Sequence, residues 1–520
     1  MSATSGANEP QRTPRRPLWN VLSNWSAFAL NAGIGFVLSP YVVHKLGGEL
    51  YGAWVLVGSL VGYLGLLDVG VRGAVTKYVA TYHAAREDEE AGRIASAALA
   101  FFGSAGLLAI LLSGLIGYAV IPFFEVPGDL RPVLPMVLVL GGASVAASLV
   151  SGVFGGVVVG VQRFDRANAL AMAVGVLRAV GIVGVLELGG GLVGLAAIQL
   201  AASVLQGAAI FAASRSLYPE LQSWRVDWTR SHLRLLLTFG ITSSLSLVCA
   251  MVSDYSDSVV IGTLLSVGEI TPFAIAASLC SYARGIVSGI SHTVTPTVGA
   301  LVGRHELERV AGLTLAYARY ATIVVLPIFV TFVLRGASFI GLWMGPQYAE
   351  TGGEVLAVLT LSIWAFAGFQ VLVCASMGLH RHRGLIPVFA LEALVNVVLS
   401  VLLAGSLGVV GVAWGTALPR LATCLVLGPL HARRHIGIPL SAYWREVLLR
   451  PSLAMLPFAL ASWAVELRWP AADLLRYGAQ VLATLPLAAL GVWLVALHHD
   501  ERRTALAAVG RVLGTPGMAR

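Results

Sequence analysis

The sequence is poor in charged residues. Asp, Glu, Lys and Arg make up only 12% of its 520 residues, hydrophobic residues make up 57%, and the mean hydropathy is +0.82. A soluble protein of this length would carry far more charge on its surface. The sequence also has no polar stretch long enough for a domain outside a membrane. These absences exclude a soluble protein and argue against a membrane enzyme with a soluble catalytic domain.

Cysteine and catalytic motifs are scarce as well. The four cysteines fall in apolar stretches without metal-ligand or CxxC spacing, so we expect packing residues and no disulfide framework. The sequence has no GxSxG elbow, phosphate-binding P-loop or HExxH zinc motif. We therefore expect no enzymatic activity, no metal site and no cofactor.

Long apolar runs fill the chain. A membrane span needs about 20 apolar residues, and fourteen runs qualify, so the sequence predicts an all-α membrane protein. The runs lie at about 20–43, 52–76, 94–121, 132–160, 168–188, 191–213, 233–264, 270–298, 310–334, 352–377, 385–404, 408–431, 447–467 and 475–498. The first run is too long for a signal-peptide core of roughly 7–15 residues, so we expect it to remain as the first helix.

The distribution of Lys and Arg predicts the orientation in the membrane. With both termini in the cytoplasm, the inward segments hold 24 of the 34 Lys and Arg, and the outward segments hold 5. This bias follows the positive-inside rule. It also accounts for the net charge of +8 without a nucleic-acid partner.

An internal repeat divides the chain. GlyLeuValGlyLeuAla at 191–196 recurs as GlyValValGlyValAla at 408–413, and two weaker matches share an offset of about 217–220 residues. Because an even number of spans separates the copies, the sequence predicts two six-helix lobes as a parallel repeat. We expect a disordered cytoplasmic N-terminus at 1–17, an N-lobe at 18–214, a cytoplasmic linker at 215–232, a C-lobe at 233–431, two extra helices at 447–498 and a basic cytoplasmic tail at 499–520.

Five arginines lie inside the predicted spans and are the main candidates for function. They are Arg72, Arg178, Arg284, Arg319 and Arg420. An arginine in hydrocarbon usually faces a bundle interior or a water-filled cavity, so the set indicates a cationic lumen and an anionic cargo. Guanidinium geometry suits a diphosphate, and we rank Arg284 before Arg178. A structural pair with a carboxylate is the alternative for these two, and snorkelling to headgroups is the alternative for Arg72 and Arg319. Asn31, a polar residue of the first span, joins the substrate-binding candidates.

Carboxylates inside the spans are candidates for coupling or gating. They are Asp68, Asp254, Asp257 and Glu392. Asp68 lies four residues before Arg72, so the two can pair. Asp254 and Asp257 lie in a polar patch of the seventh span, where a carboxylate can take a proton or a cation. A permanent salt bridge between Asp257 and Arg284 is the competing interpretation.

Two regions of the sequence resemble bacterial polysaccharide flippases. In the first 90 residues the resemblance is carried by ProTyr at 40–41, LeuGlyGly at 46–48, TyrGlyAlaTrp at 51–54, SerLeuValGlyTyrLeuGlyLeuLeuAspValGlyVal at 59–71 and LysTyrValAla at 77–80. In the second half it is carried by AspSerValValIleGly at 257–262 and ValGlyAlaLeu at 298–301. Elsewhere only hydropathy and the number of helices agree.

The resemblance implies a function and a location. Such proteins move undecaprenyl-diphosphate-linked oligosaccharide units, such as those of lipopolysaccharide O-antigen, from the inner to the outer leaflet by alternating access. This implies a multi-pass protein of the bacterial inner (cytoplasmic) membrane that serves cell-surface or exopolysaccharide synthesis. It also implies a complex with polysaccharide polymerase and assembly proteins, and Asp68 and Asp257 carry over with their motifs. The driving force is open; a proton or sodium gradient is the candidate, because the sequence has no nucleotide site.

Two other function classes stay open. Polysaccharide flippases belong to the multidrug/oligosaccharidyl-lipid/polysaccharide exporter superfamily. A cation or drug antiporter of that superfamily would need a net acidic cavity, against which the five arginines argue. A membrane glycan polymerase or ligase would need a sizeable outer loop with catalytic residues, and the predicted outer loops are short.

Overall fold

The computed structural model describes residues 16–124, 126–128, 130–219 and 229–503. Within these ranges the regular elements are all helices, and thirteen helices are long and apolar enough to cross a membrane. This confirms the predicted all-α membrane fold. The predicted segments 1–17, 215–232 and 499–520 lie partly outside the described residues.

The chain forms two compact units. Unit 1 comprises residues 1–38, 67–111 and 142–242, and unit 2 comprises residues 39–66, 112–141 and 243–520. The predicted lobes at 18–214 and 233–431, and the repeat that relates them, stay predictions.

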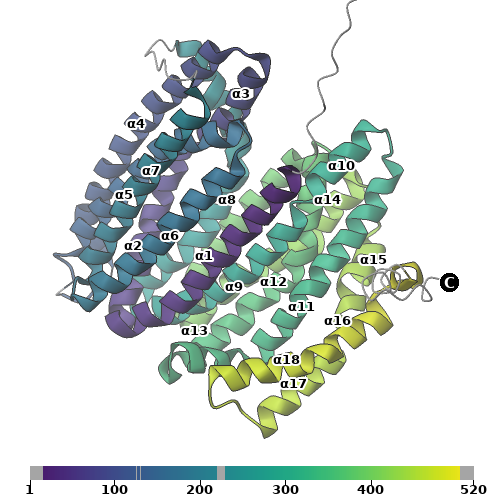
Figure 1. The fold of residues 1–520 in the computed structure, drawn as a ribbon. Coiled ribbons are helices and arrows are strands. Elements are labelled where there is room, and N and C mark those ends of the chain that lie inside the picture. Colours follow the sequence, from purple (N-terminus) through teal and green to yellow (C-terminus); the bar gives the residue numbers. More distant parts are fainter. Residues whose placement is uncertain (1–15, 125, 129, 220–228, 504–520) are drawn as a thin grey trace, which may run out of the picture. The chain divides into compact units, whose positions relative to one another are not determined.

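Unit 1 is built from segments of seven helices (Figure 1). They are α1 (Arg16–Leu46), α3 (Val71–Ala85), α4 (Asp88–Ala119), α5 (Leu134–Gly160), α6 (Phe164–Glu187), α7 (Gly191–Leu217) and α8 (Arg230–Leu264). Glycines on α5 let α3 approach closely, because a Cβ at Gly156 would lie 2.9 Å from Cγ1 of Val75. Val75 is fully buried. Such small residues are typical of helix contacts in membranes.

Unit 2 contains residues 243–264 of α8, the last residues of α1 and α4, the first residues of α5, and the remaining helices (Figure 1). These remaining helices are α2 (Gly48–Tyr63), α9 (Ile270–Ser291), α10 (Val294–Gly303), α11 (Glu308–Met344), α12 (Ala349–Gly378), α13 (Ile386–Ala422), α14 (Gly428–His435), α15 (Leu440–Tyr443), α16 (Arg450–Ala454), α17 (Leu456–Arg468) and α18 (Leu474–Gly491). Helix α12 packs against α9, α11 and α13 and is the most deeply buried span. Helices α17 and α18 pack on each other and on α11.

The predicted span at 52–76 lies within one candidate membrane span, Gly48–Ala85, but its helix is interrupted. Helix α2 passes into a 3-10 turn, Leu64–Asp68, and α3 begins after Gly70. Gly70 has a φ of 72°, a left-handed conformation that glycine adopts readily. The carboxylate of Asp68 accepts a hydrogen bond from the backbone N–H of Arg72 at 3.1 Å and so caps α3. Hydropathy alone does not register such a turn inside an apolar run.

The predicted spans at 385–404 and 408–431 are two helical segments that the turn at Gly408 separates. Both segments lie mainly in α13, in which Gly408 has non-helical backbone angles, with φ 60° and ψ −142°. The two halves of α13 pack on each other, since a Cβ at Gly415 would lie 2.4 Å from Oγ of Ser400. The thirteen helices and the fourteen predicted spans therefore agree once α13 is counted as two halves.

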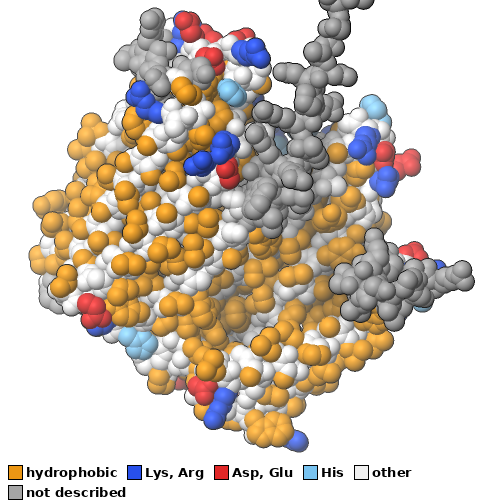
Figure 2. Space-filling view, viewed as in Figure 1, with side chains coloured by type: hydrophobic (Ala, Val, Ile, Leu, Met, Phe, Trp, Pro, Cys, Tyr) orange, Lys and Arg blue, Asp and Glu red, His pale blue; other side chains and the backbone are white. Residues whose placement is uncertain are grey.

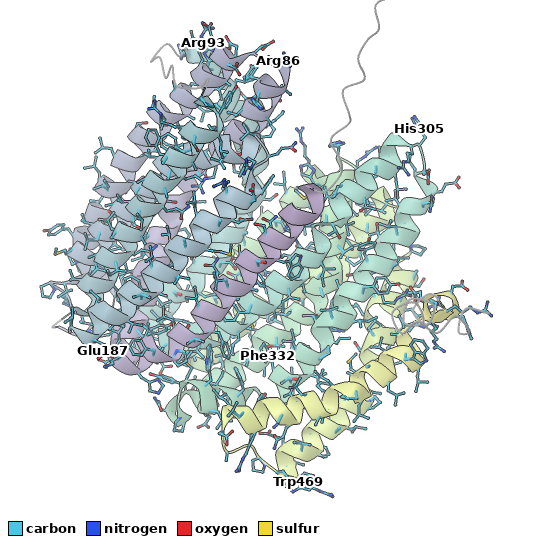
Figure 3. All side chains as sticks on the ribbon, viewed as in Figure 1. Arg86, Arg93, Glu187, His305, Phe332 and Trp469 are labelled. Atoms are coloured by element: carbon cyan, nitrogen blue, oxygen red, sulfur yellow. The ribbon has the colours of Figure 1, made fainter. Side chains whose placement is uncertain are left out.

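The surface of each unit is that of a multi-pass membrane protein. Figure 2 shows apolar side chains over α4 and α5 in unit 1, and Leu107 and Leu111 on α4 are each at least 60% exposed. Charged side chains lie at the helix ends: Figure 3 shows Arg86 and Arg93 at one end of unit 1 and Glu187 at the other. In unit 2, His305 and Trp469 mark opposite ends of the helices (Figure 3). Side chains that face lipid are apolar over the hydrocarbon thickness.

Candidate functional site

A polar pocket of about 300 Å³ lies inside unit 2. Helices α8, α9, α12 and α13 line it with charged, hydroxyl, amide and aromatic side chains. These are Ser246, Cys249, Ala250, Ser253, Asp254, Arg284, Ser288, Phe366, Phe369, Gln370, Phe389, Glu392 and Arg420. The pocket thus brings together four charged residues that the sequence singled out: Arg284, Arg420, Asp254 and Glu392.

Arg420 in this pocket is neutralised. Its Nε lies 2.5 Å from Oε1 of Glu392, which is itself buried. The break at Gly408 makes this possible, because it turns the second half of α13 back along the first. Charge-assisted hydrogen bonds of this length are strong. Glu392, a coupling candidate by sequence, is therefore the fixed partner of Arg420.

Arg284 is less tightly held. The shortest separation between its guanidinium and a carboxylate is 3.8 Å, from Nη2 to Oδ1 of Asp254. The two side chains are 29% and 53% exposed, respectively, so both reach the open part of the pocket. A separation of 3.8 Å is too long for a hydrogen bond. Arg284 therefore keeps N–H donors available to a ligand.

Asp257 is not among the residues that line this pocket. It is 4% exposed and accepts hydrogen bonds from the hydroxyls of Thr416 at 2.8 Å and Ser400 at 3.5 Å. The amide of Asn396 donates to Thr416 at 2.9 Å, and Ser256 donates to Asn396 at 3.1 Å. Asp257 and Asp254 thus serve separate environments, although both lie on α8. Asp257 and Arg284, both of which the structure describes, do not form the salt bridge of the competing interpretation.

Unit 1 contains a second polar cavity of about 320 Å³. Arg178 of α6 and Asn31 of α1 line it, together with residues of α5 and α7. The guanidinium Nη1 of Arg178 donates to Oε1 of Gln199 at 3.3 Å. The side chain of Asn31 donates to the carbonyl of Ala27, one turn earlier, at 2.8 Å. Arg178 and Asn31, two of the substrate-binding candidates in unit 1, therefore share one cavity, whereas Arg72 does not line it.

The remaining intramembrane arginines have carboxylate partners. Arg72 pairs with Asp68 at 3.4 Å and donates to the carbonyl of Ser148 at 3.2 Å. Arg319 is buried and pairs with Glu501 and with Glu446, rather than snorkelling to headgroups.

The predicted span at 310–334 ends just before Arg335 and so places this residue in an outer connection, which is wrong. Arg335 lies inside α11 and is 1% exposed. Its guanidinium donates to Glu466 of α17 at 2.6 Å and to Gln480 of α18 at 2.5 Å. Because these partners satisfy the charge, α11 continues past it to Met344. The hydropathy of a single helix contains no information about partners on other helices.

These pairings change the picture of a cationic lumen. Four of the five intramembrane arginines have a carboxylate within 4 Å, and among the described residues Arg178 has none. The pocket of unit 2 holds two arginines and two carboxylates, so its formal charge is balanced. The cavity of unit 1 has Arg178 as its one charged lining residue among those described.

Several polar residues of both sites escaped prediction. Thr416 and Ser400 hold Asp257, and Gln199 and Gln206 lie beside Arg178. The spacing of Gln199, Ser203 and Gln206 places them on one face of α7, a polar stripe in an otherwise apolar span that the sequence does display. No group of three or more His, Cys, Asp or Glu in the described ranges is arranged to hold a metal ion. The oxygen atoms around Asp257 are instead ligands of the kind that hard cations take.

Known proteins resemble this chain over most of its length. The sequence profile described as "Polysaccharide biosynthesis protein" matches residues 18–302, more than half of the chain. A Haloferax volcanii protein described as "Probable flippase AglR" is 23% identical over 433 residues, which cover 83% of this chain and 87% of the relative. The "Uncharacterized membrane protein EpsK" of Bacillus subtilis is 21% identical over 463 residues, covering 86% of this chain and 88% of the relative.

Solved structures show the same fold. The lipid II flippase MurJ in an inward closed conformation matches with a TM-score of 0.71 at 13% identity, covering 92% of this chain and 98% of that chain. An inward-facing multidrug resistance MATE family transporter of the MOP superfamily matches with a TM-score of 0.66 at 18% identity, covering 81% of this chain and 95% of that chain. At these identities the likeness establishes the fold alone.

Proposed function

Because this chain belongs to the polysaccharide biosynthesis protein family, we propose that it is a flippase for undecaprenyl-diphosphate-linked oligosaccharides. It moves these units from the inner to the outer leaflet of the bacterial inner membrane by alternating access, with both termini in the cytoplasm. The oligosaccharides then serve cell-surface or exopolysaccharide synthesis. The protein is a transporter and not an enzyme.

The observation that carries this proposal is a polar cavity with an arginine inside each unit of a membrane protein. Unit 1 holds Arg178 in a cavity of about 320 Å³, and unit 2 holds Arg284 in a pocket of about 300 Å³. Polar and charged groups in hydrocarbon are unfavourable unless they are partnered or serve a polar ligand. A diphosphate with attached sugars cannot cross about 30 Å of hydrocarbon unaided, and such cavities would replace its hydration.

The unit 2 pocket supplies groups that suit a glycan. Arg284 keeps free N–H donors, Gln370 and Ser288 add amide and hydroxyl groups, and Phe366 and Phe389 add aromatic faces. Sugars present hydroxyls at their edges and C–H groups on their faces, so this mixture of donors and rings is complementary to them. We assign Arg284 and Asp254 to substrate binding and the Arg420–Glu392 pair to the architecture of the pocket.

Asp257 is the proposed coupling residue. A charged carboxylate that is 4% exposed, and whose hydrogen-bond donors among the described residues are the hydroxyls of Thr416 and Ser400, is unfavourable inside a membrane protein. A bound proton or a sodium ion would relieve that cost. The hydroxyl oxygens of Thr416 and Ser400 would complete an oxygen environment for a cation. Occupation of Asp257 would then bias the packing of α8 against α13, the helices that supply this network.

A cation or drug antiporter is the second candidate. The structural similarity to multidrug transporters leaves it open, and one feature of unit 2 favours it: Asp254 is 53% exposed in a pocket with three phenylalanines. Carboxylate and aromatic groups together suit an organic cation. The balanced charge of the same pocket argues against it.

Deletion of the gene in its own host tests the proposal. We expect a lipid-linked oligosaccharide to accumulate in the deletion strain and surface glycan to be lost, with both restored by the wild-type gene. Increased drug sensitivity without an accumulated glycolipid would instead support the antiporter. Accumulation of a lipid-linked oligosaccharide already in the outer leaflet would indicate a polymerase or ligase and would contradict the flippase.

A further inference from the structure

The cavity of unit 1 differs from the pocket of unit 2 in its charge. Its lining combines hydroxyl and amide groups with small residues and one cation. The described lining residues are Asn31, Ser148, Ser151, Ala171, Val174, Gly175, Arg178, Gln199, Ala202, Ser203 and Gln206. None of these is acidic, and Arg178 pairs with no carboxylate among the described residues. The cavity therefore has a net positive charge.

Arg178 lies well inside the membrane-spanning length of α6. It follows Phe164 by 14 residues and precedes Glu187 by 9, which puts it about 14 Å from the nearer end of the helix. An arginine at that depth needs a polar environment. Its contact with Gln199 at 3.3 Å uses one N–H of a group that has five. Most N–H donors of the Arg178 guanidinium therefore have no hydrogen-bond acceptor among the described residues.

Amide and hydroxyl donors from neighbouring helices lie around the same space. Gln199, Ser203 and Gln206 share one face of α7, and Oε1 of Gln199 accepts from Arg178, which leaves its amide N–H groups available. Ser148 and Ser151 of α5 also line the cavity. Arg72 approaches Ser148 from outside the lining, because its Nη2 donates to the carbonyl of Ser148 at 3.2 Å, but its charge is paired with Asp68.

Small residues keep the cavity open. Ala171 and Gly175 of α6 and Ala202 of α7 line it without filling it. At Gly175 an added Cβ would lie 3.3 Å from Oδ1 of Asn31, so glycine lets α1 and α6 approach here. The cavity, at about 320 Å³, is much larger than the roughly 10–15 Å³ that one water needs.

We propose that this cavity binds an oxyanion of the transported lipid, with Arg178 as its main ligand. One cation surrounded by neutral donors matches a phosphate or carboxylate oxygen cluster. Two parts of a lipid-linked glycan carry that chemistry: the diphosphate of the polyprenyl carrier, and the carboxylate of an acidic sugar. The inference rests on the proposed function. It reverses the order expected from sequence, which ranked Arg284 first for the diphosphate.

Binding to the purified full-length protein in nanodiscs tests the inference. The probes are undecaprenyl diphosphate, undecaprenol as its uncharged counterpart, and glucuronic acid as an acidic sugar. The variants are Arg178→Gln, Arg178→Lys and Ala202→Leu. Arg163→Gln is the matched control, because Arg163 directly precedes α6, pairs with Asp165 at 3.0 Å and does not line the cavity.

We expect undecaprenyl diphosphate to bind wild-type protein more tightly than undecaprenol. Arg178→Gln should weaken that binding by about tenfold or more, because hydrogen bonds to charged groups are strong. Arg178→Lys should recover part of it, and Ala202→Leu should weaken it while keeping the charge. The control should bind as the wild type does. Glucuronic acid binding that depends on Arg178, without diphosphate binding, would assign the same site to the sugar carboxylate.

Equal binding of diphosphate by wild type and Arg178→Gln, with no Arg178-dependent binding of glucuronic acid, would overturn the inference. If undecaprenol and undecaprenyl diphosphate bind equally well, the cavity does not recognise the diphosphate, and that assignment is wrong. If Arg178→Gln fails to fold, Ala202→Leu decides. Since gene deletion tests transport and these measurements test binding, failure of the oxyanion site and failure of the flippase function remain distinguishable.

Discussion

Arg420 and Glu392 form an ion pair with 2.5 Å between Nε and Oε1, although they are 28 residues apart on α13. The turn at Gly408 brings the two halves of the helix together, and the pair then links them. It also removes one positive charge from the pocket of unit 2. Arg178 has no such partner among the described residues, so the two arginines lie in different electrostatic environments.

Loss of one member of the Arg420–Glu392 pair should destabilise the protein strongly. Glu392→Gln leaves the buried guanidinium of Arg420 without its counter-charge, and breaking a buried pair in this way typically costs about 3–5 kcal/mol. The double variant Glu392→Gln/Arg420→Gln removes both charges and should recover much of the stability. Thermal unfolding in detergent, followed by size-exclusion chromatography, measures both. Equal stability of Glu392→Gln and wild type would show that the pair is not structural.

Arg284→Ala should abolish glycan export while the protein stays folded. Arg284 is only loosely paired, so its removal leaves Asp254, which is half exposed, rather than a buried charge. Arg284→Lys should rescue export in part, because the charge is kept while the fork of N–H donors is lost. Complementation of the deletion strain and immunoblots for protein level provide the measurement, with Arg163→Gln as the control. Full export by Arg284→Ala would remove Arg284 from the transport mechanism.

Asp257→Asn should uncouple transport from the ion gradient. Asparagine keeps the size of the side chain and its contact with Thr416 but cannot ionise. We expect export by this variant to be slow and insensitive to collapse of the proton or sodium gradient. A selective ionophore for each ion distinguishes the two in the wild type. Wild-type rates with an unchanged response to both ionophores would exclude Asp257 from coupling.

The contact of the C-terminal residues with α11 should depend on pH. Burial raises the pKa of the Glu501 carboxyl, but the hydrogen bond from Tyr320 at 2.5 Å and the charge of Arg319 lower it by more, so the pKa lies below its ordinary value of 4.5. A lowered folded pKa stabilises the protein above pH 4.5, and this contribution is lost as the pH falls through the folded value. The stability difference between wild type and Glu501→Gln should therefore be constant near pH 7 and shrink below pH 4.5. A difference that does not change with pH would contradict this.

The helices were largely predictable because the hydrocarbon thickness constrains every span in the same way. Runs of about 20 apolar residues located the spans, and their failures have specific causes. The turn before Gly70 lies in sequence as apolar as its surroundings. The predicted span at 310–334 ends before Arg335, but Glu466 of α17 and Gln480 of α18 accept hydrogen bonds from its guanidinium, and α11 continues.

The sequence predicted which charged residues belong to the candidate sites, but it did not predict which side chains they contact. Depth in a span identified Arg178, Arg284 and Arg420 as residues that need polar surroundings. Which side chain supplies those surroundings depends on the rotation and packing of other helices, which hydropathy does not encode. Asp254 rather than Asp257 faces Arg284, and Thr416, from the second half of α13, holds Asp257.

Translocation by the purified protein in sealed vesicles tests the central claim most directly. Vesicles are prepared with an undecaprenyl-diphosphate-linked oligosaccharide in both leaflets, and a glycosidase added outside then reports how much of it reaches the outer leaflet. The account predicts that cleavage stops near half in protein-free vesicles and approaches completion with wild-type protein and an ion gradient. It also predicts a lower rate for Arg178→Gln and Arg284→Ala but not for Arg163→Gln. Cleavage that stops near half with folded wild-type protein, whichever ion gradient is applied, would contradict the flippase assignment.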